Sequence, residues 1–220
     1  MGTPSANYVA KMEDVLAVYQ RPYDPRRPQI CLDETSKELR ATPQGTEPLT
    51  VHHARREDYE YSREGVRNLF LWVEPLTGRR QVTVTARRTA VDFAEQLKAL
   101  VEEVYPDAER LVLVVDNLNP HGPAALYQRF PPAEAFRLAQ KLEWHYTPEH
   151  GSWLNMAEIE LSVLARQCTK GRIATEEVLR TKTTAWHDRR NAARVTIDWR
   201  FTTEDARIKL KRLYPKLEQY

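Results

Sequence analysis

The chain has 220 residues, enough for one large domain or two small ones; 41% are hydrophobic and 29% are charged. This balance is typical of a globular protein. No apolar run approaches the length of a membrane span, and the N-terminus does not resemble a signal peptide. The only cysteines, Cys31 and Cys168, lack metal-ligand spacing, which favours a reducing, cytoplasmic location.

The positive charge of the chain is unevenly distributed. The net charge is only +2, but residues 164–220 contain 14 Lys or Arg against 7 Asp or Glu. A basic segment of this kind suggests a polyanionic partner. On charge alone, a solvated helix face is an equally good interpretation.

Apolar spacing and turn residues predict the elements of the N-terminal half. In chain order these are an amphipathic helix at 5–20, a proline-rich linker at 21–28, a strand at 29–34, a polar insertion at 35–66 and hairpin strands at 68–75 and 80–86. Within the insertion, Arg55 and Arg56 could face a phosphate, although a solvated loop is the simpler interpretation.

The C-terminal half alternates strands with helices. Its predicted elements are a helix from Thr89 to Pro106, a strand at 111–115, helical segments at 122–139, a strand at 142–146, a helix from Ser152 to about Gln167, a helix at 175–190, a strand at 194–200 and a helix at 202–214. The whole order predicts an α/β fold, with a mixed five-stranded sheet flanked by helices on both faces. We divide the chain into residues 1–28, a helix and linker, and residues 29–220, the main domain with a basic helical extension.

Two predicted strands end in carboxylates. Five aliphatic residues at 111–115 lead directly to Asp116, and the strand at 29–34 ends at Asp33 and Glu34. A single aspartate here could simply begin a turn. If the two strands are parallel neighbours, however, Asp33 and Asp116 lie side by side at one edge of the sheet.

The helix after Ser152 offers a third carboxylate. At 100° per residue, Leu154, Leu161 and Ala165 form its apolar stripe. Glu158 lies at the margin of that stripe, whereas Glu160 lies near the opposite face and points to solvent or to another element. Glu158 is therefore the better candidate for a site at the sheet edge, and Asn155, on the same side, could orient it.

Three converging carboxylates repel one another unless a cation lies between them. Mg²⁺ and Mn²⁺ prefer oxygen ligands, and two such ions about 4 Å apart can activate an attacking hydroxyl and stabilise a leaving oxygen at a phosphodiester. The pattern of acids thus predicts metal-dependent phosphoryl transfer.

Four blocks of sequence resemble DDE transposases, in particular bacterial insertion-sequence transposases related to the mariner superfamily. They are Leu32–Glu34 (LDE), Val115–His121 (VDNLNPH), Tyr146–Glu158 (YTPEHGSWLNMAE) and Trp199–Leu210 (WRFTTEDARIKL). The resemblance extends over roughly residues 7–215.

This resemblance implies an RNase H-like fold in which Asp33, Asp116 and Glu158 bind two Mg²⁺ ions, with Mn²⁺ as a substitute. It implies hydrolysis of double-stranded DNA at transposon ends, followed by attack of the freed 3′-hydroxyl on target DNA at TA sites. It also implies that the active protein is a homodimer and is not attached to a membrane. The residues expected to contact DNA are His121, Asn155, Arg55, Arg56 and Arg172. For His121, a role beside the acids or in stabilising the turn is an equal alternative.

Two features depart from the family pattern. The interval from Asp116 to Glu158 is 42 positions, longer than in mariner-like proteins, and only 32 residues precede Asp33, whereas full-length relatives carry helix-turn-helix domains there. Two alternatives therefore stay open. One is a truncated fragment that binds DNA or a partner and regulates without catalysis, and the other is a different RNase H-like nuclease such as a resolvase.

Overall fold

The computed structural model describes residues 5–42, 46–47, 56–57, 60–117 and 121–215. Its strands are β1 (Gln29–Ala41), β2 (Thr46–Glu47), β3 (Arg56–Glu57), β4 (Ser62–Glu74), β5 (Arg79–Thr85), β6 (Leu111–Val115) and β7 (Leu142–Tyr146). Its α-helices are α1 (Ala6–Tyr19), α2 (Ala90–Ala99), α3 (Ala124–Arg129), α4 (Pro132–Gln140), α5 (Met156–Gln167), α6 (Glu176–Ala192) and α7 (Thr203–Lys209). None of the helices described is both long and apolar enough to cross a membrane.

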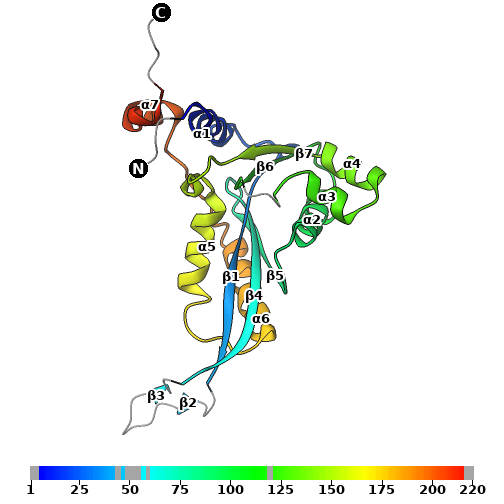
Figure 1. Ribbon diagram of the computed structural model, residues 1–220, viewed down its shortest axis with the longest axis vertical. Coiled ribbons are helices and arrows are strands. Elements are labelled where there is room, and N and C mark those ends of the chain that lie inside the picture. Colours follow the sequence, from blue (N-terminus) through cyan, green and yellow to red (C-terminus); the bar gives the residue numbers. More distant parts are fainter. Residues whose placement is uncertain (1–4, 43–45, 48–55, 58–59, 118–120, 216–220) are drawn as a thin grey trace, which may run out of the picture.

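Five strands form one mixed sheet in the order β5-β4-β1-β6-β7 (Figure 1). Strand β1 pairs antiparallel with β4, which pairs antiparallel with β5, whereas β1, β6 and β7 run parallel. The predicted strand at 29–34, the hairpin strands after it and the two later strands are confirmed, and the first three form an antiparallel meander. Because β6 is covered on both faces, all five of its residues are buried and apolar.

Helices cover both faces of the sheet, as predicted (Figure 1). On one face, the alternate residues Cys31, Val112 and Val114 pack with α1, α5 and α6. On the other face, Leu32 and Leu113 pack with α2, α3 and α4. Because successive residues of a strand point to opposite faces, the position of a residue in the strand decides which group of helices it packs against.

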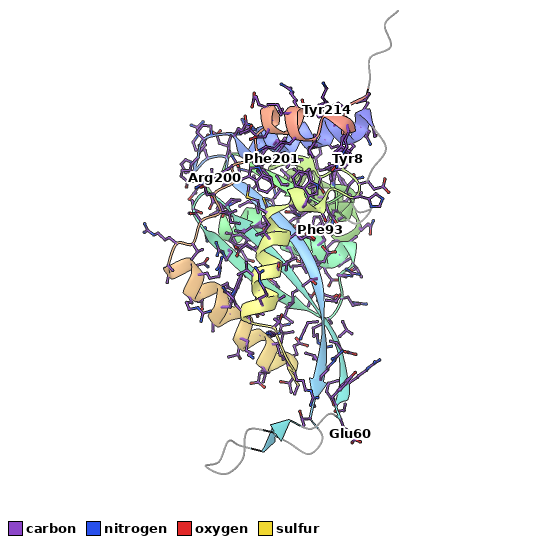
Figure 2. The ribbon with its side chains drawn as sticks, turned by 90° about the vertical axis from the view of Figure 1, so that its left-hand side faces the viewer. Tyr8, Glu60, Phe93, Arg200, Phe201 and Tyr214 are labelled. Carbon is purple, nitrogen blue, oxygen red and sulfur yellow. The ribbon has the colours of Figure 1, made fainter. Side chains whose placement is uncertain are left out.

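Helix α1 contributes to the main core rather than standing apart from it. Met12, Val15, Leu16 and Val18 are fully buried within the core of the α5 face. Helix α7 lies beside α1 at the same end of the molecule (Figure 2), where both Arg207 and Tyr214 bind the carboxylate of Glu13.

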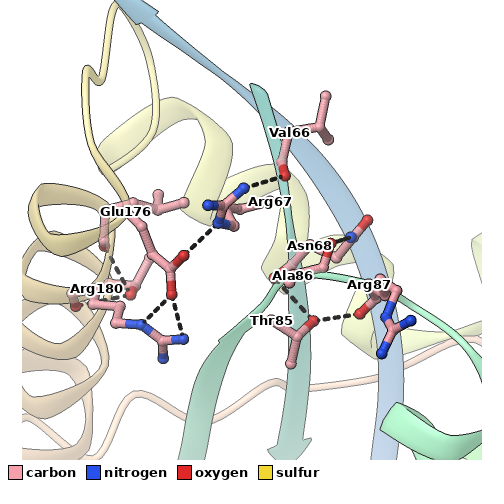
Figure 3. Close-up of polar contacts among 10 residues, drawn as sticks. Val66, Arg67, Asn68, Thr85, Ala86, Arg87, Glu176 and Arg180 are labelled. Carbon is pink, nitrogen blue, oxygen red and sulfur yellow. Dashed lines mark hydrogen bonds and ion pairs between the residues drawn. The ribbon is translucent and has the colours of Figure 1, made fainter. Parts of the chain in front are cut away.

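Strands β1 and β4 continue beyond their neighbours as a two-stranded extension, residues 37–41 and 62–67, which we call the arm. The polar insertion predicted at 35–66 thus contains long strand segments. The base of the arm is bound to the C-terminal half: Lys37 donates to the carbonyl oxygens of Thr169 and Gly171 at 2.7 and 2.9 Å. Figure 3 shows Arg67 on β4 paired with Glu176 at the start of α6.

Two sequence predictions at the C-terminal side are wrong. The helix predicted from Ser152 begins at Met156, because residues 152–154 form a 3-10 turn and the Asn155 side chain accepts the N–H of Ala157 as the N-cap. No strand forms at 194–200. This segment lies along the end of β4, where the N–H of Ile197 donates to the carbonyl oxygen of Pro75 at 3.0 Å.

Candidate active site and metal centre

Asp33 and Asp116 lie at matching positions on adjacent parallel strands. The β1–β6 register pairs Gln29 with Val112 and Cys31 with Val114. Continuing that register by two residues places Asp33 opposite Asp116. Asp33 lies two residues after Cys31, and Asp116 lies two residues after Val114. Because alternate residues of a strand point to the same face, both acids lie on the α5 face of the sheet.

Glu158 reaches the same place from a helix. It lies in the first turn of α5 and is exposed, because the packed side of that helix is formed by Met156, Ala157 and Leu161. Asp33, Asp116 and Glu158 all line one cavity of about 430 Å³. The three acids chosen from the sequence are therefore brought together, and their role as metal ligands stays a prediction.

The cavity is electrostatically unfavourable for carboxylates. Burial raises the pKa of Asp33 to about 7, together with the negative charges of Asp116, Glu34 and Glu158. A hydrogen bond from the N–H of Glu34 to Asp33 Oδ1, at 2.8 Å, opposes this rise. A carboxyl group with this pKa would be substantially protonated at neutral pH, and a nearby cation would reverse that.

His121 binds two acids from the side of the cavity. Its Nδ1 contacts Asp116, and its Nε2 lies 3.0 Å from an oxygen of Glu34. Burial lowers the pKa of His121, but the two carboxylates outweigh that effect and raise it to about 9. The side chain is only 2% exposed and packs against Phe93, so His121 lies beside the acids, and its contact with DNA stays a prediction.

Glu34 is the site residue that sequence reasoning passed over. It neighbours Asp33 in β1, so alternation turns it toward the opposite face, where it meets His121 and lies 3.8 Å from Arg88. Its side chain is 5% exposed. The signal was present, since Glu34 belongs to the same strand-end motif as Asp33.

Asn155 joins strand β1 to the helix of the third acid. Its Nδ2 donates to the carbonyl oxygen of Leu32 at 3.1 Å and lies 3.4 Å from Asp33 Oδ2, while its Oδ1 caps α5. The side chain is fully buried. These hydrogen bonds would allow Asn155 to position the first turn of α5, and its contact with DNA stays a prediction.

One of the arginines expected to contact DNA, Arg172, lies away from the cavity. Arg172 lies at the arm, where it donates to Thr42 Oγ1 and to the carbonyl oxygen of Glu60, both at 3.3 Å. Arg56 belongs to β3, and Arg55 lies outside the described residues. Contact of these arginines with DNA stays a prediction.

The donor set of the cavity suits a hard divalent cation. Within the ranges that the structure describes, no three Asp, Glu, His or Cys side chains are arranged closely enough to hold a metal ion as they stand. Nevertheless, the cavity gathers carboxylate oxygens, and burial together with the neighbouring carboxylates raises the pKa of Asp33. Asp33, Asp116 and Glu158 are the residues that would hold the metal. His121 would fix the carboxylate of Asp116, and Asn155 would fix the start of α5.

Comparison with solved structures supports the fold. The chain is similar to the mariner Mos1 paired end complex with Mg, with 14% identity and a TM-score of 0.54 over 98% of this chain and 66% of that one. It is also similar to the Mos1 strand transfer complex, with 14% identity and a TM-score of 0.51 over 97% of this chain and 61% of that one. The chain thus spans less than two thirds of the length of these proteins.

Comparison of sequences identifies the family. No curated protein matches the chain. The family model described as DDE superfamily endonuclease matches residues 28–180, which include Asp33, Asp116 and Glu158 and make up more than two thirds of the chain. The chain therefore belongs to the DDE superfamily endonucleases.

Proposed function

We propose that this chain is the catalytic domain of a DNA transposase that hydrolyses phosphodiesters at transposon ends and joins the freed 3′-hydroxyl to target DNA. The observation that carries the proposal is the single cavity that receives Asp33 and Asp116 from adjacent parallel strands and Glu158 from α5. Membership of the DDE endonuclease family and the RNase H-like fold support it.

The chain's own residues hold and orient the reacting groups. Asp33, Asp116 and Glu158 would bind two Mg²⁺ ions, and Mn²⁺ would substitute because it prefers the same ligands. When bound, the metal would supply Lewis-acid activation of the attacking oxygen and stabilisation of the leaving oxygen. His121 holds the Asp116 carboxylate, and Asn155 fixes the first turn of α5 against Leu32 of β1.

The substrate and assembly belong to the same proposal. We propose double-stranded DNA as the substrate, insertion at TA sites, and a homodimer in the active complex that joins two transposon ends. Support comes from the Mos1 structures, whose descriptions name a paired end complex with Mg and a strand transfer complex. We also propose that the chain comes from a bacterial insertion sequence and acts in the cytoplasm, at the nucleoid.

The test is cleavage and joining of labelled DNA taken from both sides of the gene, where the proposed function places the transposon ends. With Mg²⁺ the wild type should nick this DNA and join it to a target plasmid, whereas Asp116→Asn should reduce both products by at least about 1000-fold because a metal ligand is lost. Retention of activity in the folded variant contradicts the assignment of Asp116.

The products also separate the alternatives. Hydrolysis without joined products would indicate a plain nuclease such as a resolvase. Binding of DNA by a well-folded wild type that neither cleaves nor joins it, with Mg²⁺ or Mn²⁺ present, would favour a fragment that regulates without catalysis.

A further inference from the structure

Four aromatic side chains from three distant segments form a cluster beside the carboxylate cavity. The indole of Trp153 lies nearly parallel to that of Trp199, with centroids 6.4 Å apart, and meets the edge of Phe201 at 5.8 Å. Its Nε1 donates to the Tyr8 hydroxyl at 3.4 Å. We call Trp153, Trp199, Phe201 and Tyr8 the aromatic platform, and Figure 2 shows Tyr8 and Phe201 near the start of α5.

The turn that carries Trp153 is held in place from both sides. The buried Tyr19 hydroxyl donates to the carbonyl oxygen of Leu154 at 2.6 Å. The N–H of Asn155 donates to the carbonyl oxygen of Ser152 at 2.7 Å. A side chain at Gly151 would place its Cβ 2.5 Å from Pro148, so only glycine fits there without movement. Trp153 is therefore presented in one orientation before any ligand binds.

Despite this support, much of the Trp153 ring remains open to solvent. The residue is 41% exposed, and the residue before it, Ser152, lines the cavity of Asp33, Asp116 and Glu158. Trp153 therefore lies one residue along the chain from the lining of the cavity in which a DNA phosphate would react. An aromatic ring that is rigidly supported yet uncovered is suited to receive another flat ring.

The charge around the platform suits a polyanion. Residues 200–212, which follow Trp199 and include Phe201, contain five Lys or Arg against two Asp or Glu. Lys209 lies over the Phe201 ring at 5.5 Å and pairs with Asp205 at 2.7 Å, and its side chain is 63% exposed. Such cations attract a phosphate backbone, while the ring supplies a sequence-tolerant stacking surface.

We propose that Trp153 stacks on an unpaired nucleobase of the DNA strand whose phosphate lies at the carboxylate cavity. This inference rests on the proposed function and names a subsite for it. A base separated from its partner exposes a flat face, and a base that remains paired within the duplex does not. Trp153 therefore selects DNA that is frayed or single-stranded next to the reacting phosphate.

Two DNAs with the same paired sequence test the proposal. One is blunt and the other carries a short 3′ overhang with 2-aminopurine, and both are measured by anisotropy at one fixed salt concentration with Ca²⁺ in place of Mg²⁺. Trp153→Ala should weaken binding of the overhang DNA by about 5- to 150-fold and leave blunt DNA within about twofold. Trp153→Phe should retain most of the affinity and the quenching of 2-aminopurine.

Phe136→Ala provides the control, because Phe136 is 57% exposed on α4, which packs on the other side of the sheet. It should change neither affinity. Equal losses for both DNAs in Trp153→Ala, an equal loss in Phe136→Ala, or a change of oligomeric state in Trp153→Ala would each overturn the inference. Cleavage that depends on Asp116 would leave the proposed function standing in all three cases.

Discussion

Two glutamates on the same helix have opposite environments, and their spacing explains the difference. Glu158 and Glu160 are two positions apart, so they project from nearly opposite sides of α5. Glu158 is exposed at the cavity, whereas Glu160 is 2% exposed and lies between Arg80 and Arg190. The sequence therefore predicted the choice between the two acids, but not the arginine partners, which come from β5 and α6.

Glu160 should be one of the most costly residues to truncate. It lies 3.2 Å from Arg80, which is fully buried, and 2.8 Å from Arg190. Burial lowers the pKa of Arg80 to about 10, and the charge of Glu160 opposes that change. Glu160→Ala would leave two guanidinium groups without their counter-charge, so we expect a loss of about 3–5 kcal/mol in the free energy of unfolding.

Chemical denaturation with urea measures this loss. Glu177→Ala, an exposed position on α6, is the matched control and should stay within about 0.5 kcal/mol of the wild type. A loss below about 1 kcal/mol for Glu160→Ala would contradict this prediction, because it would show that water solvates the two arginines in place of the carboxylate.

At the scale of elements, the local sequence pattern predicted those helices and strands whose formation depends mainly on nearby residues. Thr89 caps α2 and forms a capping box with Asp92, and the strand at 111–115 has the predicted bounds. The segment 194–200 alternates like a strand but does not join the sheet: within the described part of the chain it forms no ladder, and the N–H of Ile197 donates to the carbonyl oxygen of Pro75 instead. Strand formation depends on a partner, and a single sequence does not supply one.

The linker before β1 is bound to β7 through Glu143. Arg21 donates to this carboxylate at 2.7 Å, Arg27 also pairs with it, and His145 Nε2 lies 3.0 Å away. Burial raises the pKa of Glu143, but hydrogen bonds from Arg21, His145 and Arg27 outweigh burial and lower it to about 2. The carboxylate therefore binds fewer protons in the folded state than in the unfolded state at acid pH.

This shift predicts how stability depends on pH. The contribution of Glu143 is fully present above pH 4.5, the ordinary pKa, and is lost as the pH falls toward 2. Glu143→Gln should lower stability by about 1 kcal/mol at pH 7, after screening at a partly exposed site, and should flatten the curve between pH 4.5 and 2. Thermal unfolding across this range is the measurement, with the exposed Glu149→Gln as control. Parallel curves for Glu143→Gln and the wild type would contradict the role of Glu143.

At the scale of the whole molecule, the site depends on elements far apart in sequence. Asp33 comes from β1, Asp116 follows β6, and Glu158 lies on α5, whose approach is fixed by Asn155 and by the Tyr19 hydroxyl of α1. The order of acids along the chain was sufficient to predict that they converge. It was not sufficient to predict that the N-terminal helix helps to hold them.

The final prediction concerns the division of the chain at residue 28. Met12, Val15, Leu16 and Val18 are each fully buried, and burying four such side chains contributes about 6–12 kcal/mol. The entire free energy of unfolding of a domain is roughly 5–15 kcal/mol. We therefore expect the fragment 29–220 to lack a cooperative unfolding transition in circular dichroism and to bind a dye for exposed apolar surface.

In the full chain, Leu16→Ala should cost about 2–5 kcal/mol, whereas the exposed Asn7→Ala should change stability by less than about 0.5 kcal/mol. A fragment 29–220 that unfolds cooperatively near the temperature of the full chain would show that α1 is an accessory to the core, and the division at residue 28 would then mark a true domain boundary.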